Sequence, residues 1–214
     1  MRACTVGMLI GVLALVCPAE ILDRIAVTVG DHVITEQQIV KEIRLAAFLN
    51  RAQPDLSVAS KQAAAEQLIR QDLVRREMES THYPLPEKSD ADPLEKQIID
   101  QYGGESTYTT ALATYGLTRS EVHEQLWWQL ATLRFIDYRF KPAVHVPAVA
   151  IESYYKEQVA KWTAEGQKNI PTLEDSRDSI EQILAAQRVD EALDAWLADT
   201  RKQLTIRYRK EAFE

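Results

Sequence analysis

The sequence predicts a mainly α-helical fold in which a small β element joins the two ends of the chain. Residues 24–29 alternate and are rich in β-branched side chains, Gly30 marks a turn, and residues 32–34 continue in an extended form. Residues 204–208 indicate a further strand at the other end. Because unpaired strand backbone is costly, we expect the N-terminal strands to pair with the C-terminal strand.

The rest of the chain is predicted to be helical with short connections. Thr35 followed by Gln38, and Thr118 followed by Glu121, match capping boxes that open helices. Gly116 ends a short helix, and the prolines within residues 83–93 indicate a loop. We expect helices from Thr35 onward and over residues 58–78, 94–102, 108–115, 118–140, 148–162 and 173–202.

The composition limits the classes of function. The chain has 214 residues, of which 46% are hydrophobic, and its net charge of -7 argues against a dedicated nucleic-acid binder. The sequence contains no glycine-rich phosphate loop, no nucleophile elbow and no paired-cysteine metal site, and its four histidines are dispersed. We therefore predict a protein that is not an enzyme and has neither catalytic residues nor a cofactor or metal site.

Residues 1–19 have the proportions of a signal peptide. Arg2 supplies a positive charge, residues 6–16 carry no charge, and small residues surround Ala19. The uncharged run is too short to span a bilayer, which takes about 20 apolar residues. We predict that residues 20–214 are exported to the periplasm, with no stable membrane insertion. A buried N-terminal helix and a lipidated Cys17 are the alternative interpretations.

Both cysteines, Cys4 and Cys17, fall inside this segment. Cleavage after Ala19 would leave the mature chain without cysteine. We therefore expect no disulfide scaffold and no thiol chemistry in residues 20–214.

The helix predicted over residues 118–140 is apolar on two faces. At about 100° per residue, one side gathers the stripe that we expect to face the core. This stripe consists of Val122, Leu126, Leu133 and Phe140. The roughly opposite side gathers aromatic residues, namely Trp127, Trp128, Phe135 and Tyr138. Such a helix is either enclosed by the core on both sides or presents its second face to another molecule.

The last helix also has two apolar faces. Ile180, Ile183 and Leu184 share one of them. The second begins at Val189 and continues to Leu197, about half a turn away around the axis. We expect this helix to change neighbours midway along its length.

Four stretches of the sequence resemble the SurA family of periplasmic chaperones. They are residues 23–35, residues 63–74, residues 115–140 with 151–155, and residues 189–197 with 206–208. The resemblance implies one SurA-like domain over residues 20–214. It would comprise an N-terminal helical module (20–162), a linker (163–172), and a closing helix and strand (173–214).

Family members usually carry parvulin-type prolyl isomerase domains at the position of that linker. Residues 163–172 are far too few for a sheet with several helices, so the isomerase domain is missing. The proline-rich loop over residues 83–93 is a second departure from the family, which usually has a tighter connection there.

The resemblance implies an ATP-independent chaperone that binds unfolded or partly folded exported polypeptides, with outer-membrane proteins in transit as candidate clients. The predicted client-binding residues are Trp127, Trp128, Phe135 and Tyr138. A scaffold or subunit protein that docks one defined partner through an apolar helix face is the alternative. An isomerase that acts without the usual domain is a third possibility.

Overall fold

The computed structural model describes residues 23–214, and within them the fold is mainly α-helical with one small antiparallel sheet, which confirms the predicted fold class. The predicted signal peptide, with Cys4 and Cys17, lies outside the described residues.

The sheet joins the two ends of the described chain. Strands β1 (Ile25–Val29) and β2 (His32–Thr35) form a hairpin, and β3 (Ile206–Tyr208) pairs antiparallel with the other edge of β1. Gly30 takes a positive φ of 60° in the hairpin turn, a conformation that glycine adopts without strain. The hydrogen bond from Gly30 N to Thr205 O, at 3.0 Å, extends the β1–β3 pairing. The predicted closure of the chain is confirmed.

The helices lie close to their predicted positions. Capping boxes open three of them, at Thr35, Thr118 and Thr172, and Gly116 ends α4 in the left-handed conformation. The helices are α1 (Glu36–Leu49), α2 (Val58–Ser80), α3 (Asp92–Gln101), α4 (Glu105–Tyr115), α5 (Arg119–Phe140), α6 (Ala148–Ala164) and α7 (Leu173–Lys202). Short 3₁₀ turns are η1 (Lys88–Ala91), η2 (Lys141–Ala143) and η3 (Lys210–Ala212).

Two apolar clusters hold these elements together. The first packs the sheet against α1, α2 and the end of α7, and it includes Val27, Ile69 and Phe213. The second lies among α1, α3, α4 and α5, and it is centred on Phe48 and Tyr108. Helix α5 contributes buried side chains to both clusters, so it connects the two halves of the core.

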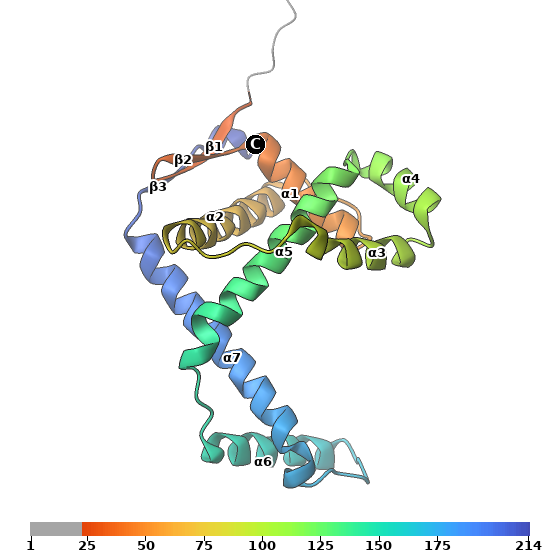
Figure 1. The fold of residues 1–214 in the computed structure, drawn as a ribbon, viewed down its shortest axis with the longest axis vertical. Coiled ribbons are helices and arrows are strands. Elements are labelled where there is room, and N and C mark those ends of the chain that lie inside the picture. The colour runs from red at the N-terminus through yellow and green to blue at the C-terminus, as the bar shows by residue number, and fades with distance from the viewer. Residues whose placement is uncertain (1–22) are drawn as a thin grey trace, which may run out of the picture.

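Helix α7 links the sheet to a helical hairpin that it forms with α6. Figure 1 shows this hairpin at the end of the molecule opposite the sheet. Ile151 of α6 and Ile180 of α7 are buried there, whereas Leu197 is buried in the first apolar cluster. As its two apolar faces predict, α7 therefore changes neighbours along its length.

An ion pair ties the start of α5 to α1. The Lys41 Nζ lies 2.8 Å from Oε1 of Glu121, and Oε2 of the same carboxylate accepts a hydrogen bond from the backbone N–H of Thr118 in the capping box. The hydrogen bond from Lys41, followed by that from the Thr118 backbone, lowers the pKa of Glu121 to about 2.

The charge of Glu121 should make stability depend on pH. Because folding depresses its pKa from 4.5 to about 2, the stabilisation is complete above pH 4.5 and is lost as the pH falls toward 2. Glu121→Gln keeps an amide that can complete the capping box but removes the charge. In denaturant melts, we expect the variant to be less stable than the wild type at pH 7 and equally stable near pH 2. Glu191→Gln, at an exposed position of α7, is the control. A stability difference that is constant across this range would contradict the assignment.

Candidate functional site

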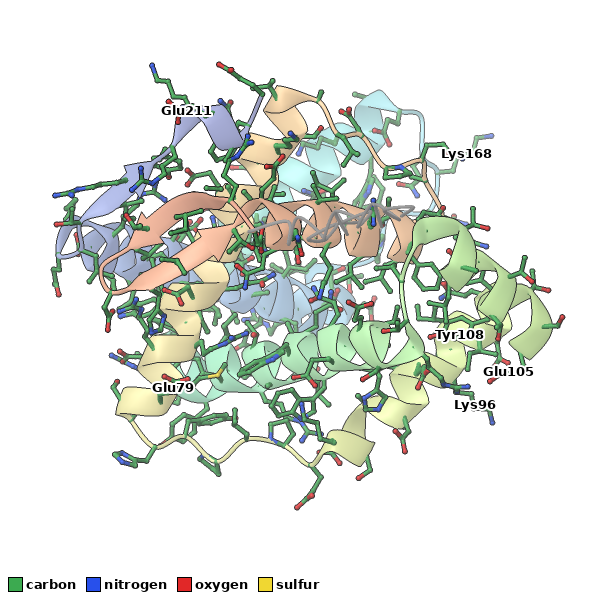
Figure 2. All side chains as sticks on the ribbon, turned by 90° about the horizontal axis from the view of Figure 1, so that it is seen from above. Glu79, Lys96, Glu105, Tyr108, Lys168 and Glu211 are labelled. Carbon is green, nitrogen blue, oxygen red and sulfur yellow. The ribbon has the colours of Figure 1, made fainter. Side chains whose placement is uncertain are left out.

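Helix α5 is covered on two sides along part of its length. One side packs in the core, and residues 83–87 with η1 pass over the other. Figure 2 shows Glu79, at the end of α2, and Lys96, on α3, on either side of this connecting segment. The loop that the sequence predicts over residues 83–93 therefore acts as a cover for α5, and η1 lies within it.

Two of the four predicted client-binding residues lie in the core. Trp127 is 5% exposed, and its Nε1 donates to the Pro86 carbonyl oxygen at 3.0 Å. Phe135 is 1% exposed and meets the Tyr83 ring edge-on, with centroids 5.2 Å apart. The expectation that these four side chains share one accessible face is wrong, because the segment after α2 covers part of that face.

The predicted core stripe needs a correction as well. Leu126 and Leu133 are seven residues apart and point in nearly the same direction from α5. Leu126 is buried in the second apolar cluster, but Leu133 is 65% exposed. The elements that cover this side of the helix near Leu126 do not reach Leu133.

The other two predicted residues remain accessible. Trp128 is half-buried and packs against both apolar clusters. Tyr138 is 68% exposed and lies beside Tyr83, with ring centroids 5.3 Å apart. Trp128 and Leu133 thus form a partly open apolar surface on α5, which does not include Tyr138.

A pocket of about 280 Å³ opens between α2 and α5 at this surface. Its apolar lining consists of Met78, Trp128 and Leu133. Its remaining lining is polar without a carboxylate, and consists of Gln67, Gln71, Arg75, Gln125, Gln129 and Thr132. The pocket therefore combines an apolar surface with amide groups that both donate and accept hydrogen bonds.

Two contacts organise the polar part of this pocket. The Arg75 guanidinium lies over the Trp128 ring, 4.1 Å from its centroid, in the geometry of a cation–π interaction. The Gln71 Nε2 donates to a carboxylate oxygen of Glu42 at 3.2 Å. Burial raises the pKa of Glu42, against the effect of this hydrogen bond. Glu42 does not line the pocket. The charged residue in the lining is Arg75, so the pocket carries a positive charge although the protein as a whole is acidic.

Two larger cavities are more polar, and a third, of about 330 Å³ between α1 and α2, is shallow and open, with Glu42 and Asp55 in its lining. One, of about 440 Å³, lies beside α1 and the start of α5, and oppositely charged residues around it pair with each other, as Lys41 does with Glu121 at 2.8 Å. The other, of about 550 Å³, lies between α2 and the C-terminal residues, with Glu66 and Lys210 in its wall. The pocket between α2 and α5 is the better match to an apolar ligand.

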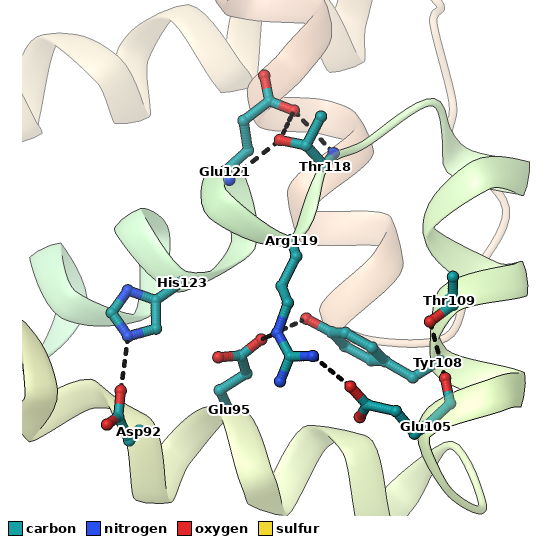
Figure 3. A network of polar contacts seen from close by, with 9 residues as sticks. All are labelled: Asp92, Glu95, Glu105, Tyr108, Thr109, Thr118, Arg119, Glu121 and His123. Carbon is teal, nitrogen blue, oxygen red and sulfur yellow. Dashed lines mark hydrogen bonds and ion pairs between the residues drawn. The ribbon is translucent and has the colours of Figure 1, made fainter.

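A buried carboxylate joins α3, α4 and α5 elsewhere in the structure. Figure 3 shows Arg119 between Glu95 and Glu105, with the Tyr108 ring beside it. The Arg119 Nε lies 2.7 Å from Glu95, and the Tyr108 hydroxyl donates to the same carboxylate at 3.2 Å. Burial, followed by the nearby Glu95 charge, raises the pKa of Tyr108. These groups satisfy one another, so we interpret the cluster as a structural connection between the three helices.

The described residues show few features of other kinds of site. No group of three or more His, Cys, Asp or Glu side chains within residues 23–214 is arranged to hold a metal ion. Among the helices of the same residues, none is long and apolar enough to cross a membrane. No protein-family model matches the chain, and a search of curated proteins finds no significant match.

Sequence reasoning missed most of the pocket. Trp128 was predicted, but Arg75, Met78 and the glutamines were not. A signal is nevertheless present, because Gln67, Gln71 and Arg75 recur every four residues on α2, as Gln125 and Gln129 do on α5. Residues four apart share a helix face, so the two repeats predict two polar stripes, one of which ends in the positive charge of Arg75.

The two environments on α5 predict different costs for neighbouring substitutions. Phe135→Ala removes a fully buried ring and should destabilise the protein by roughly 3–5 kcal/mol. Leu133→Ala removes an exposed side chain and should change the free energy of unfolding by no more than about 0.5 kcal/mol. Denaturant melts of both variants test this assignment. Similar losses of stability in the two variants would contradict it.

Proposed function

We propose that this protein is an exported, ATP-independent chaperone of the SurA type, which binds unfolded or partly folded polypeptides without isomerase activity. The observation that carries the proposal is the pocket between α2 and α5, where Trp128 and Leu133 offer apolar surface to a ligand. The resemblance of the sequence to the SurA family supports the same function.

The chemistry of the pocket suits clients of varied sequence. The glutamine side chains match the N–H and C=O groups that every extended polypeptide carries, whatever its side chains are. Met78 adds a flexible, polarizable apolar surface of the kind that adapts to different partners. A pocket with these properties selects for unfolded backbone and apolar side chains rather than for one sequence.

The size of the pocket favours weak and reversible binding. A volume of about 280 Å³ accepts one large side chain with adjoining backbone, not the surface of a folded protein. Burying one apolar side chain contributes about 1.5–3 kcal/mol, which gives low affinity for each contact. Such contacts restrain aggregation while leaving a client free to dissociate and fold. The net charge of -7 helps to keep the complex in solution.

A charge introduced at the pocket should weaken client binding without unfolding the protein. Leu133→Asp places a carboxylate at a position that is 65% exposed, and Val149→Asp does the same at a position on α6 that is 67% exposed. We expect the wild type and Val149→Asp to suppress aggregation of several chemically denatured proteins without ATP. Leu133→Asp should need several-fold more protein for the same effect, with an almost unchanged melt.

The alternative function gives a different result in the same assay. A scaffold or subunit that docks one defined partner through α5 would leave aggregation of unrelated denatured proteins unchanged. It would instead bind one folded protein at a fixed stoichiometry. Failure of the wild type to protect any denatured protein would therefore reject the chaperone proposal.

A further inference from the structure

Helix α2 carries three arginines, and the contacts of Arg75 differ from those of the other two. Arg70 pairs with Asp194 at 2.9 Å, and Arg76 pairs with Asp31 and Asp72 at the same distance. Arg75 forms no ion pair and no hydrogen bond with any residue in the described part of the chain. Its guanidinium lies instead over the Trp128 ring, at the pocket.

Stacking prepares this guanidinium to bind an anion. The aromatic face holds the planar group in position and leaves its N–H groups, which lie in the plane, directed to the sides. A guanidinium in this state binds a carboxylate through two parallel hydrogen bonds. Arg75 is exposed and the pocket lining contains no carboxylate, so its guanidinium is free to bind a carboxylate that the ligand supplies.

We propose that the pocket preferentially binds the C-terminal residue of an unfolded polypeptide, with its apolar side chain between Met78, Trp128 and Leu133 and its terminal carboxylate on Arg75. This inference rests on the proposed function and names the part of the client that the same pocket recognises. A C-terminal residue carries an apolar side chain and a carboxylate on one Cα. An internal aspartate or glutamate carries the charge on the side chain itself, which the apolar lining would exclude.

The glutamines explain why we expect the ligand to be a peptide rather than another acid with an apolar chain. Four amide side chains surround the pocket, at Gln67, Gln71, Gln125 and Gln129. They match the backbone groups of the residues that precede a peptide C-terminus. A fatty acid has the same carboxylate and apolar chain but offers no backbone N–H or C=O groups to these amides.

A pair of peptides that differ only at the terminus tests the proposal on the full chain. The probe is a fluorescein-labelled glycine-serine peptide that ends in phenylalanine, with either a free carboxylate or a C-terminal amide. In anisotropy titrations, we expect the free acid to bind the wild type at least about tenfold more tightly than the amide, which corresponds to about 1.4 kcal/mol. High salt should reduce this preference.

Two variants that each remove one positive charge test whether Arg75 causes the preference for the free acid. Arg75→Gln should abolish the preference for the free acid. Arg70→Gln, on the same helix but in an exposed pair with Asp194, should retain it. Equal binding of the two peptides to the wild type would overturn the proposal. So would a preference that survives Arg75→Gln, or decanoate displacing the peptide more strongly than the unlabelled free acid does.

The aggregation assay separates this proposal from the proposed function. If the wild type suppresses aggregation but does not distinguish the two peptides, recognition of the C-terminus is rejected and the chaperone function stands. If it neither binds the peptides nor suppresses aggregation, both proposals fail.

Discussion

The pairing of β1 with β3 is the constraint on which the rest of the structure depends. It brings residues about 180 positions apart into one sheet, with Val27 opposite Tyr208 and Val29 opposite Ile206. This pairing fixes the C-terminal end of α7. Helix α7 also contacts α2 and α5, and it packs against α6. Arg201 reinforces the closure, because its Nη1 bonds to Glu66 of α2 at 2.6 Å while Nη2 bonds to the Tyr208 hydroxyl of β3 at 2.7 Å.

The binding pocket follows from how α2 and α5 are held. Helix α7 contacts both of them, with Leu197 in the core and Trp196 about 6.0 Å from Phe140 between ring centroids. On another side, Trp127 and Phe135 are covered by the segment that follows α2. Between these two regions Leu133 is left exposed and Trp128 half-covered. The accessible apolar surface therefore exists where the covering elements end.

The sequence predicted features that depend on local chemistry. Capping boxes at Thr35 and Thr118, Gly116 and the alternation in residues 24–29 placed the helices and the hairpin. Pairing of the chain ends was also predictable, since an isolated strand in a helical protein needs a partner. The predicted strand over residues 204–208 is shorter in the structure and begins at Ile206, because the backbone N–H of Leu204 still bonds to the carbonyl of Arg201 at the end of α7.

The site was less predictable because its features depend on contacts between distant segments. Periodicity shows that α5 is apolar on two faces, but it cannot show that residues 83–87 bury Trp127 and leave Leu133 accessible. The role of Arg75 depends on the ring of Trp128, which lies on another helix. Burial of Glu95 depends in the same way on Tyr108 and Arg119, from two other helices.

Hydrogen exchange on a shortened chain tests most directly whether closure of the ends holds the pocket together. A chain that ends at Gln203 loses β3 and the buried Phe213, whereas a control that lacks only Glu214 retains both. We predict that the shorter chain loses amide protection in β1 and also in α5 around Trp128, while the control matches the full chain. Full protection of the α5 amides in the shorter chain would show that the pocket does not depend on the pairing of the ends.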